Sequence, residues 1–120
     1  HFNSINDTWG HEAGDATLCH LARLLEACSR EGDIVCRIGG EEFMLLLPAT
    51  PLVEAAKVGE RVRKRVAGSA VDGVGTITVS LGIAGWPVSG RKPADVVKQA
   101  DRLMYRAKQA GRNRLYVDTP

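Results

Sequence analysis

The chain has 120 residues, enough for one domain with a hydrophobic core but too few for two. Its 16 basic and 14 acidic residues are interspersed and leave a net charge of +2. Duplex binding requires a basic stripe, so we expect no nucleic-acid partner. No apolar run approaches the roughly 20 residues of a membrane span, so we also expect no membrane contact by this chain.

Three cysteines, Cys19, Cys28 and Cys36, lie in apolar contexts without CxxC spacing. Their odd number and spacing favour neither disulfides nor a zinc site. We therefore expect three buried thiols and a cytoplasmic location.

Residues 1–8 open the chain without a methionine or a strand, so we expect the chain to be cut from a longer protein. Phe2, Ile5 and Trp9 recur at helical spacing and predict a short helix. A polar turn is expected over residues 10–15.

Asp15 is placed to N-cap the next helix, which should run to about Ser29. Apolar residues at helical spacing predict that this helix faces the core. They are Leu18, Leu21, Ala22, Leu25 and Cys28.

Residues 34–36 and 43–47 are two apolar runs that flank a short turn, a pattern typical of a β-hairpin. Adjacent glycines leave the backbone bare, and two carboxylates beside it can hold a hard cation such as Mg²⁺ with a phosphate or nucleotide. Solvated glutamates on an ordinary hairpin are the alternative. The turn residues are Gly39, Gly40, Glu41 and Glu42.

An amphipathic helix is predicted over residues 50–67, followed by a loop over residues 68–75. Apolar residues then alternate along residues 76–84, which predicts a strand with one buried face.

After a second loop, residues 94–109 form a third predicted helix. Its apolar face includes Val97, Ala100, Leu103, Met104 and Ala107, and Gly111 stands at its C′ position. A short last strand is predicted over residues 115–117.

The predicted order is helix, hairpin, helix, strand, helix, strand. A strand before residue 1 would complete a split βαβ, ferredoxin-like arrangement with an antiparallel-type sheet and helices packed on it. The pattern therefore predicts an α+β fold that lacks its first strand in this chain, and one domain over residues 1–120.

Four segments resemble one family. Gly39-Gly40-Glu41-Glu42-Phe43 looks like the signature turn of the GGDEF-type diguanylate cyclases, which join two GTP molecules into cyclic di-GMP. Residues 2–15, 80–84 and 100–113 are similar to three further motifs in the family's order. The resemblance covers essentially the whole chain and implies a palm-like sheet related to that of nucleotidyl cyclases.

The resemblance implies how GTP is bound. Asn6 and Asp15 fall where the family recognises guanine, and a carboxylate can accept from the guanine N1–H and N2–H₂ edge. Lys108 and Arg112 fall where the family contacts the triphosphate, and their spacing predicts a shared helix face. The alternatives are a plain N-cap at Asp15 and cations that complement a helix dipole.

Glu41 and Glu42 occupy the family's acidic positions and are implied to bind Mg²⁺ or Mn²⁺ and to carry catalysis. Gly39 and Gly40 leave room for the nucleotide. The resemblance also implies that a metal-binding aspartate lies on the strand expected before residue 1, so we expect weak or no catalysis from this chain alone. Asn3 stands where the family commonly has lysine.

Arg30 and Asp33 match the family's inhibitory RxxD product site, and Arg61 fits its secondary arginine. Guanidinium groups suit contacts with guanine and phosphate, but RxxD without the resemblance is an ordinary polar loop.

The implied activity is diguanylate cyclase, with two domains facing each other as a homodimer and with product inhibition by cyclic di-GMP. A catalytically silent module that senses GTP or cyclic di-GMP and regulates a neighbouring domain is the alternative. A domain that merely dimerises is a third possibility.

Overall fold

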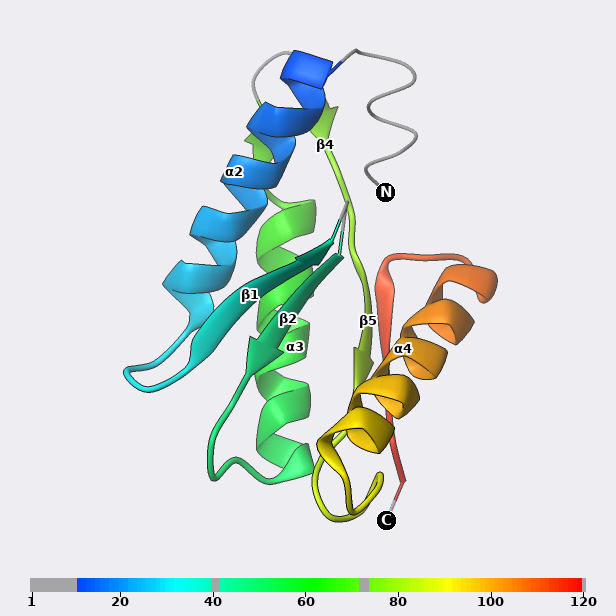
Figure 1. The fold of residues 1–120 in the computed structure, drawn as a ribbon. Coiled ribbons are helices and arrows are strands. Elements are labelled where there is room, and N and C mark those ends of the chain that lie inside the picture. The colour runs from blue at the N-terminus through cyan, green and yellow to red at the C-terminus, as the bar shows by residue number, and fades with distance from the viewer. Residues whose placement is uncertain (1–10, 40–41, 72–73, 120) are drawn as a thin grey trace. The chain divides into compact units, whose positions relative to one another are not determined.

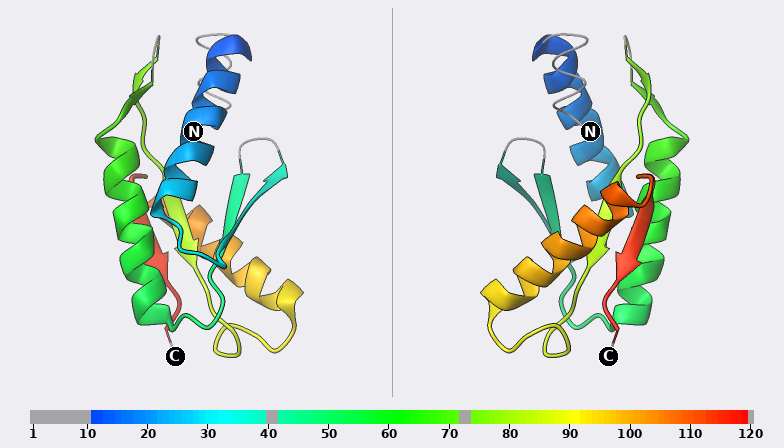
Figure 2. Two further views of the ribbon diagram at one scale, coloured as in Figure 1. Left: turned by 90° about the vertical axis from the view of Figure 1, so that its left-hand side faces the viewer. Right: turned by 90° about the vertical axis from the view of Figure 1, so that its right-hand side faces the viewer.

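The structure, a computed structural model, describes residues 11–39, 42–71 and 74–119 (Figures 1 and 2). The segment before residue 11, with its predicted short helix, lies outside the described residues. The chain divides into two compact units. The first unit is His1–Pro48 with Arg65–Ile77, and the second is Ala49–Lys64 with Thr78–Pro120.

Helix α2, His11–Cys28, opens the described part of the first unit (Figure 1). It begins four residues before Asp15, so the predicted polar turn and the N-cap at Asp15 are both wrong. The predicted core face is correct at Leu21, Leu25 and Cys28, which are buried. These residues recur every three or four positions and therefore share one side of the helix.

Cys19 is exposed, whereas we expected it to be buried. It precedes the buried Leu21 by two positions, which places it about 200° around the helix and on the opposite side. Cys28 is buried and Cys36 is half-buried, and all three thiols are free.

The predicted hairpin is present as β1, Ile34–Gly39, and β2, Glu42–Leu46. The two strands pair antiparallel from Ile34 opposite Leu46 to Gly39 opposite Glu42. Figure 2 shows them as a two-stranded ribbon.

Helix α3, Leu52–Ala67, confirms the second predicted helix. Its buried valines, Val58, Val62 and Val66, recur every four positions. Past its end, a bond of 3.1 Å between His20 Nε2 and Ser69 Oγ joins α2 to the following segment.

The region expected to be a loop contains two short strands, β3, Ala70–Val71, and β4, Gly75–Thr76, which pair antiparallel. The predicted continuous strand over residues 76–84 is also wrong, because β5 covers only Ser80–Ile83. Strands persist only where a neighbour bonds to them. Here β4 pairs with β3 and β5 pairs with β6, so the chain changes partner between them.

The second unit contains a strand–helix–strand crossover. Strands β5 and β6, Arg114–Val117, pair in parallel, from Ser80 opposite Arg114 to Ile83 opposite Val117. Parallel neighbours need a long connection, and α4, Pro93–Gln109, supplies it while packing on both strands.

Helix α4 buries Leu103 and Ala107, as predicted, but Val97 is 41% exposed. Val97 precedes Leu103 by six positions, about 120° around the helix, so it lies at the edge of the packed face. Gly111 follows the C-cap Ala110 with φ of 121°, which confirms its C′ position.

Within the described ranges, helices accompany three two-stranded sheets, two antiparallel and one parallel. The mixed helix and sheet class predicted from the sequence is confirmed.

Gly82 is the tightest position in the second unit. A Cβ there would overlap the carbonyl oxygen of Ala100 and the backbone nitrogen of Met104, both in α4. We predict that Gly82→Ala lowers the free energy of unfolding by about 1–3 kcal/mol in denaturant titrations, because backbone atoms cannot move aside cheaply.

Gly85→Ala is the matched control. Its Cβ would lie 3.1 Å from Leu52 side-chain atoms, which can shift, so the loss should be smaller. Equal losses for the two variants would contradict the packing argument.

Candidate functional site

Two residues of the Gly-Gly-Glu-Glu signature, Gly39 and Glu42, belong to the β1–β2 hairpin. The register shifts between Arg37 and Gly39, so β1 carries an extra residue directly before the glycines. Such bulges bend a strand and often accompany binding sites. Gly39 ends β1 and Glu42 begins β2 opposite it, while Gly40 and Glu41 lie outside the described residues.

The two residues predicted to recognise guanine belong to the start of the chain. Asn6 lies outside the described residues, and Asp15 lies in the second turn of α2. Guanine recognition by these two residues stays a prediction.

Lys108 and Arg112 do not share a helix face, contrary to our expectation. Helix α4 ends at Gln109, so Lys108 lies in its last turn and is half-buried. Arg112 lies beyond the end, in an exposed turn with φ of 61°. The structure thus presents the two cations from a helix end and from the turn that follows it.

Backbone bonds hold that turn against the helix end. The Arg112 N–H donates to the Ala107 carbonyl over 2.9 Å, and the Gly111 N–H donates to the Lys108 carbonyl over 3.4 Å. The two bonds span five and three positions, the pattern of a C-terminal helix cap with a left-handed glycine. The position of the Arg112 backbone is therefore set by α4.

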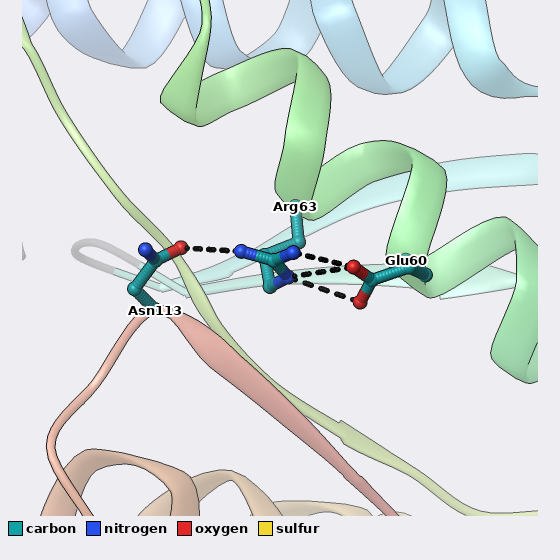
Figure 3. Close-up of polar contacts among 3 residues, drawn as sticks. All are labelled: Glu60, Arg63 and Asn113. Atoms are coloured by element: carbon teal, nitrogen blue, oxygen red, sulfur yellow. Dashed lines mark hydrogen bonds and ion pairs between the residues drawn. The ribbon is translucent and has the colours of Figure 1, made fainter.

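A polar cluster of Glu60, Arg63 and Asn113 joins α3 to the same turn (Figure 3). Arg63 Nε donates to both Glu60 carboxylate oxygens, over 3.1 and 3.0 Å, and Nη2 also donates to Oε1. Arg63 Nη1 donates to Asn113 Oδ1 over 3.0 Å. The Arg63 guanidinium therefore bonds one residue three positions away and another 50 positions away.

The same bonds shift the titration of the pair. The hydrogen bond from Arg63 lowers the pKa of Glu60 and outweighs the opposing effect of desolvation. The bond also raises the pKa of Arg63. Both groups are therefore charged at neutral pH.

In the sequence, Arg63 is one of several charged residues on the amphipathic helix predicted over residues 50–67. The i,i+3 spacing of Glu60 and Arg63 could have indicated an ion pair. The bond to Asn113 had no local signal, because it depends on how α3 and the α4–β6 turn meet.

Arg30 and Asp33 of the RxxD segment interact locally. The Arg30 N–H donates to Asp33 Oδ2 over 2.8 Å, and Arg30 Nε lies 3.6 Å from the same oxygen. The Asp33 side chain is only 3% exposed, whereas that of Arg30 is 58% exposed. Asp33 therefore shapes the loop, and Arg30 is the accessible partner of the two.

Arg61, the third residue predicted for the product site, is exposed on α3. It belongs to the second unit, whereas Arg30 and Asp33 belong to the first.

The fit of the hairpin tip to a metal ion rests on its donor chemistry. Carboxylate oxygens are the preferred protein ligands of Mg²⁺, and Glu42 begins β2 opposite a glycine that carries no side chain. No group of three or more His, Cys, Asp or Glu side chains that could hold a metal occurs among the described residues. Metal binding by Glu41 and Glu42 therefore stays a prediction.

In the first unit, strands β1 and β2 end and begin at the signature residues Gly39 and Glu42, and in the second unit a cationic turn follows a parallel crossover. The described helices and small sheets belong to the mixed helix and sheet class. The family described as "Diguanylate cyclase, GGDEF domain" matches residues 1–114, and the chain belongs to this family.

Diguanylate cyclase DgcM of Escherichia coli is 49% identical over 115 residues, which cover 95% of this chain and 28% of that protein. The response regulator PleD of Caulobacter vibrioides is 38% identical over 117 residues, covering 93% of this chain and 26% of that protein. The chain thus spans little more than a quarter of these relatives.

Among solved structures, the active GGEEF domain of a diguanylate cyclase from Vibrio cholerae superposes with a TM-score of 0.90 and 32% identity. The superposition covers 99% of this chain and 77% of that one. This likeness confirms the GGDEF-type fold implied by the four motifs.

Within residues 11–39, 42–71 and 74–119, every helix is too short or too polar to traverse a bilayer.

The lowered pKa of Glu60 predicts how stability depends on pH. A carboxyl with a lowered native pKa stabilises the fold above its unfolded pKa of about 4.3, and this stabilisation disappears as pH falls through the native pKa. We predict that Glu60→Gln unfolds at lower denaturant concentration than the parent at pH 7, and that the difference shrinks towards pH 3.

Glu26→Gln, at an exposed position of α2, is the control and should show no such pH-dependent difference. A Glu60→Gln difference that stays constant from pH 7 to pH 3 would contradict the argument.

Proposed function

We propose that the protein is a diguanylate cyclase that condenses two GTP molecules into cyclic di-GMP and two pyrophosphates. The observation that carries this proposal is the bulged β1–β2 hairpin. Strand β1 ends at Gly39 and strand β2 begins at Glu42, both within the Gly-Gly-Glu-Glu-Phe signature. Membership of the GGDEF family and the names of its relatives support it. The family match includes residues of both units, which supports one domain over residues 1–120.

In this proposal Glu41 and Glu42 hold Mg²⁺ or Mn²⁺. The cation would offset charge on the phosphate oxygens while a ribose 3′-hydroxyl attacks the α-phosphate in line. In each of the two attacks one P–O bond forms, the bond to pyrophosphate breaks, and the hydroxyl proton passes to solvent. Gly39 and Gly40 leave the backbone open to the nucleotide.

Lys108 and Arg112 are proposed to bind the triphosphate. The backbone of Arg112 is held by Ala107, so its guanidinium starts from a fixed position at the helix end. A guanidinium and an ammonium can together offset the charge of a polyphosphate. Asn6 and Asp15 are proposed to recognise the guanine edge, which adenine does not share.

Each domain would bind one GTP, so the reaction needs two domains related by a twofold axis. We therefore propose a homodimer as the active species. A cytoplasmic location, where GTP is available, is consistent with the three free thiols.

Product inhibition is proposed at Arg30, Asp33 and Arg61. The GGDEF domain of DgcB from Caulobacter crescentus, solved in complex with c-di-GMP, superposes on this chain with a TM-score of 0.83 and 31% identity. That superposition covers 98% of this chain and 71% of that one. The exposed Arg30 side chain suits contacts with guanine or phosphate.

The activity is tested with the purified full-length protein, GTP and Mg²⁺, and detection of cyclic di-GMP by mass. We predict product formation at a rate per domain that rises with protein concentration. Glu42→Gln should lower the rate by about 100-fold or more, because it removes a charge that holds the cation.

Glu26→Gln is the matched control and should retain the parent rate. A parent protein that binds GTP or cyclic di-GMP without making product would instead support the sensing module.

A separate prediction concerns inhibition. Arg30→Ala should raise the cyclic di-GMP concentration for half-inhibition by about tenfold or more, because a hydrogen bond to a charged group contributes about 1.5–3 kcal/mol. The initial rate without product should not change.

Arg23→Ala, at an exposed position on α2, is the control for loss of a surface cation. Unchanged inhibition in Arg30→Ala would exclude this arginine from the product site.

A further inference from the structure

The turn between α4 and β6 has an unusual backbone. Gly111, Arg112 and Asn113 follow one another with φ of 121°, 61° and 49°. Positive φ is natural for glycine and tolerated by asparagine, but costs other residues about 1–2 kcal/mol. The Arg112 conformation therefore persists only because the surroundings hold it.

Both peptide groups of Arg112 have a partner. Its N–H donates to the Ala107 carbonyl, and its carbonyl accepts from Arg114 Nε over 3.1 Å. These contacts come from residues close in sequence on either side of the turn. Asn113 also accepts a bond from Arg63, which lies outside the turn, on α3 (Figure 3).

Arg63 is well suited to this contact because its own position is fixed. The Nε edge of its guanidinium is held by the Glu60 carboxylate, and Nη1 points to Asn113. Its side chain is only 22% exposed, and the planar fork leaves little freedom once two directions are occupied. Arg63 thus ties the second half of the turn to α3.

An ion pair at a protein surface contributes little to stability. The geometry of the cluster instead affects a neighbouring residue, because Asn113 follows Arg112 directly. A change of backbone angle at Asn113 would move the Arg112 peptide and redirect its side chain.

We propose that Arg63, held by Glu60, is a positioning residue that fixes the Gly111–Asn113 turn and thereby aims Arg112 at the β- and γ-phosphates of GTP. This inference rests on the proposed GTP-binding function. It predicts that Arg63 affects affinity for the phosphate chain and not for the guanosine part of the ligand.

The test compares the full-length protein with Arg63→Ala, Asn113→Gly and the double variant. Glycine keeps the left-handed conformation of residue 113 accessible while deleting the side-chain acceptor. Calorimetry would measure binding of a non-hydrolysable GTP analogue with Mg²⁺, and of GMP, which lacks the β- and γ-phosphates. Lys64→Ala, a neighbouring exposed cation on α3, is the matched control.

Each single variant should bind the GTP analogue about five- to tenfold more weakly and GMP within twofold of the parent. The double variant should be no weaker than either single variant, because both remove the same contact. Lys64→Ala should bind both ligands as the parent does.

Unchanged binding of the analogue, equal losses for the analogue and GMP, or additive losses in the double variant would each overturn the positioning role. If the parent protein binds neither nucleotide, the proposed function fails and the inference fails with it. If the parent binds and the variants match it, only the inference fails. Asn113→Gly lies on an exposed turn, so it tests the contact even if Arg63→Ala does not fold.

Discussion

The second unit depends on a close approach between β5 and α4 in which no side chain fits. At Gly82 the strand backbone lies against the backbone of α4 at Ala100 and Met104. This approach lets α4 pack on both β5 and β6, whose parallel pairing requires such a crossover. The end of α4, and the turn after it, are then placed relative to the small sheet.

Two sets of hydrogen bonds then fix the backbone of the turn that carries Arg112. The end of α4 holds the Arg112 backbone through Ala107, and α3 holds Asn113 through Arg63. The turn is thus attached at both ends despite three consecutive positive φ angles. In the proposed function this rigidity lowers the cost of ordering Arg112 around a phosphate chain.

The sequence predicted those features that depend on local pattern. The hairpin, the helices over residues 52–67 and 93–109, and the C′ glycine at Gly111 all have signals within one element. The features that it missed depend on contacts between distant segments. Cys19 was expected to be buried from its apolar sequence context, and Val97 from its place on the apolar face of a helix, but both are exposed. The strand predicted over residues 76–84 is interrupted because the chain exchanges one pairing partner for another.

In the candidate site, too, the sequence predicted the local features and missed those that depend on distant residues. The motifs identified Gly39, Glu42, Lys108 and Arg112. The i,i+4 spacing of Lys108 and Arg112 also predicted that these two cations share a helix face, which is wrong. The helix ends between the two cations. Arg63, 50 positions before Asn113, donates a hydrogen bond to the turn that carries Arg112. A motif therefore identifies side chains of the right chemistry, while the turn and its long-range bond determine how they are presented.

We propose that this chain recognises GTP through its guanine base and its phosphate chain with separate sets of residues. Amide chemical shifts of the full-length protein, titrated with non-hydrolysable GTP and ATP analogues in the presence of Mg²⁺, test this proposal directly. The GTP analogue should shift the amides of Asp15, Glu42 and Arg112, and the ATP analogue should leave Asp15 unshifted. Equal shifts at Asp15 with both nucleotides, or none at Arg112 with either, would contradict it.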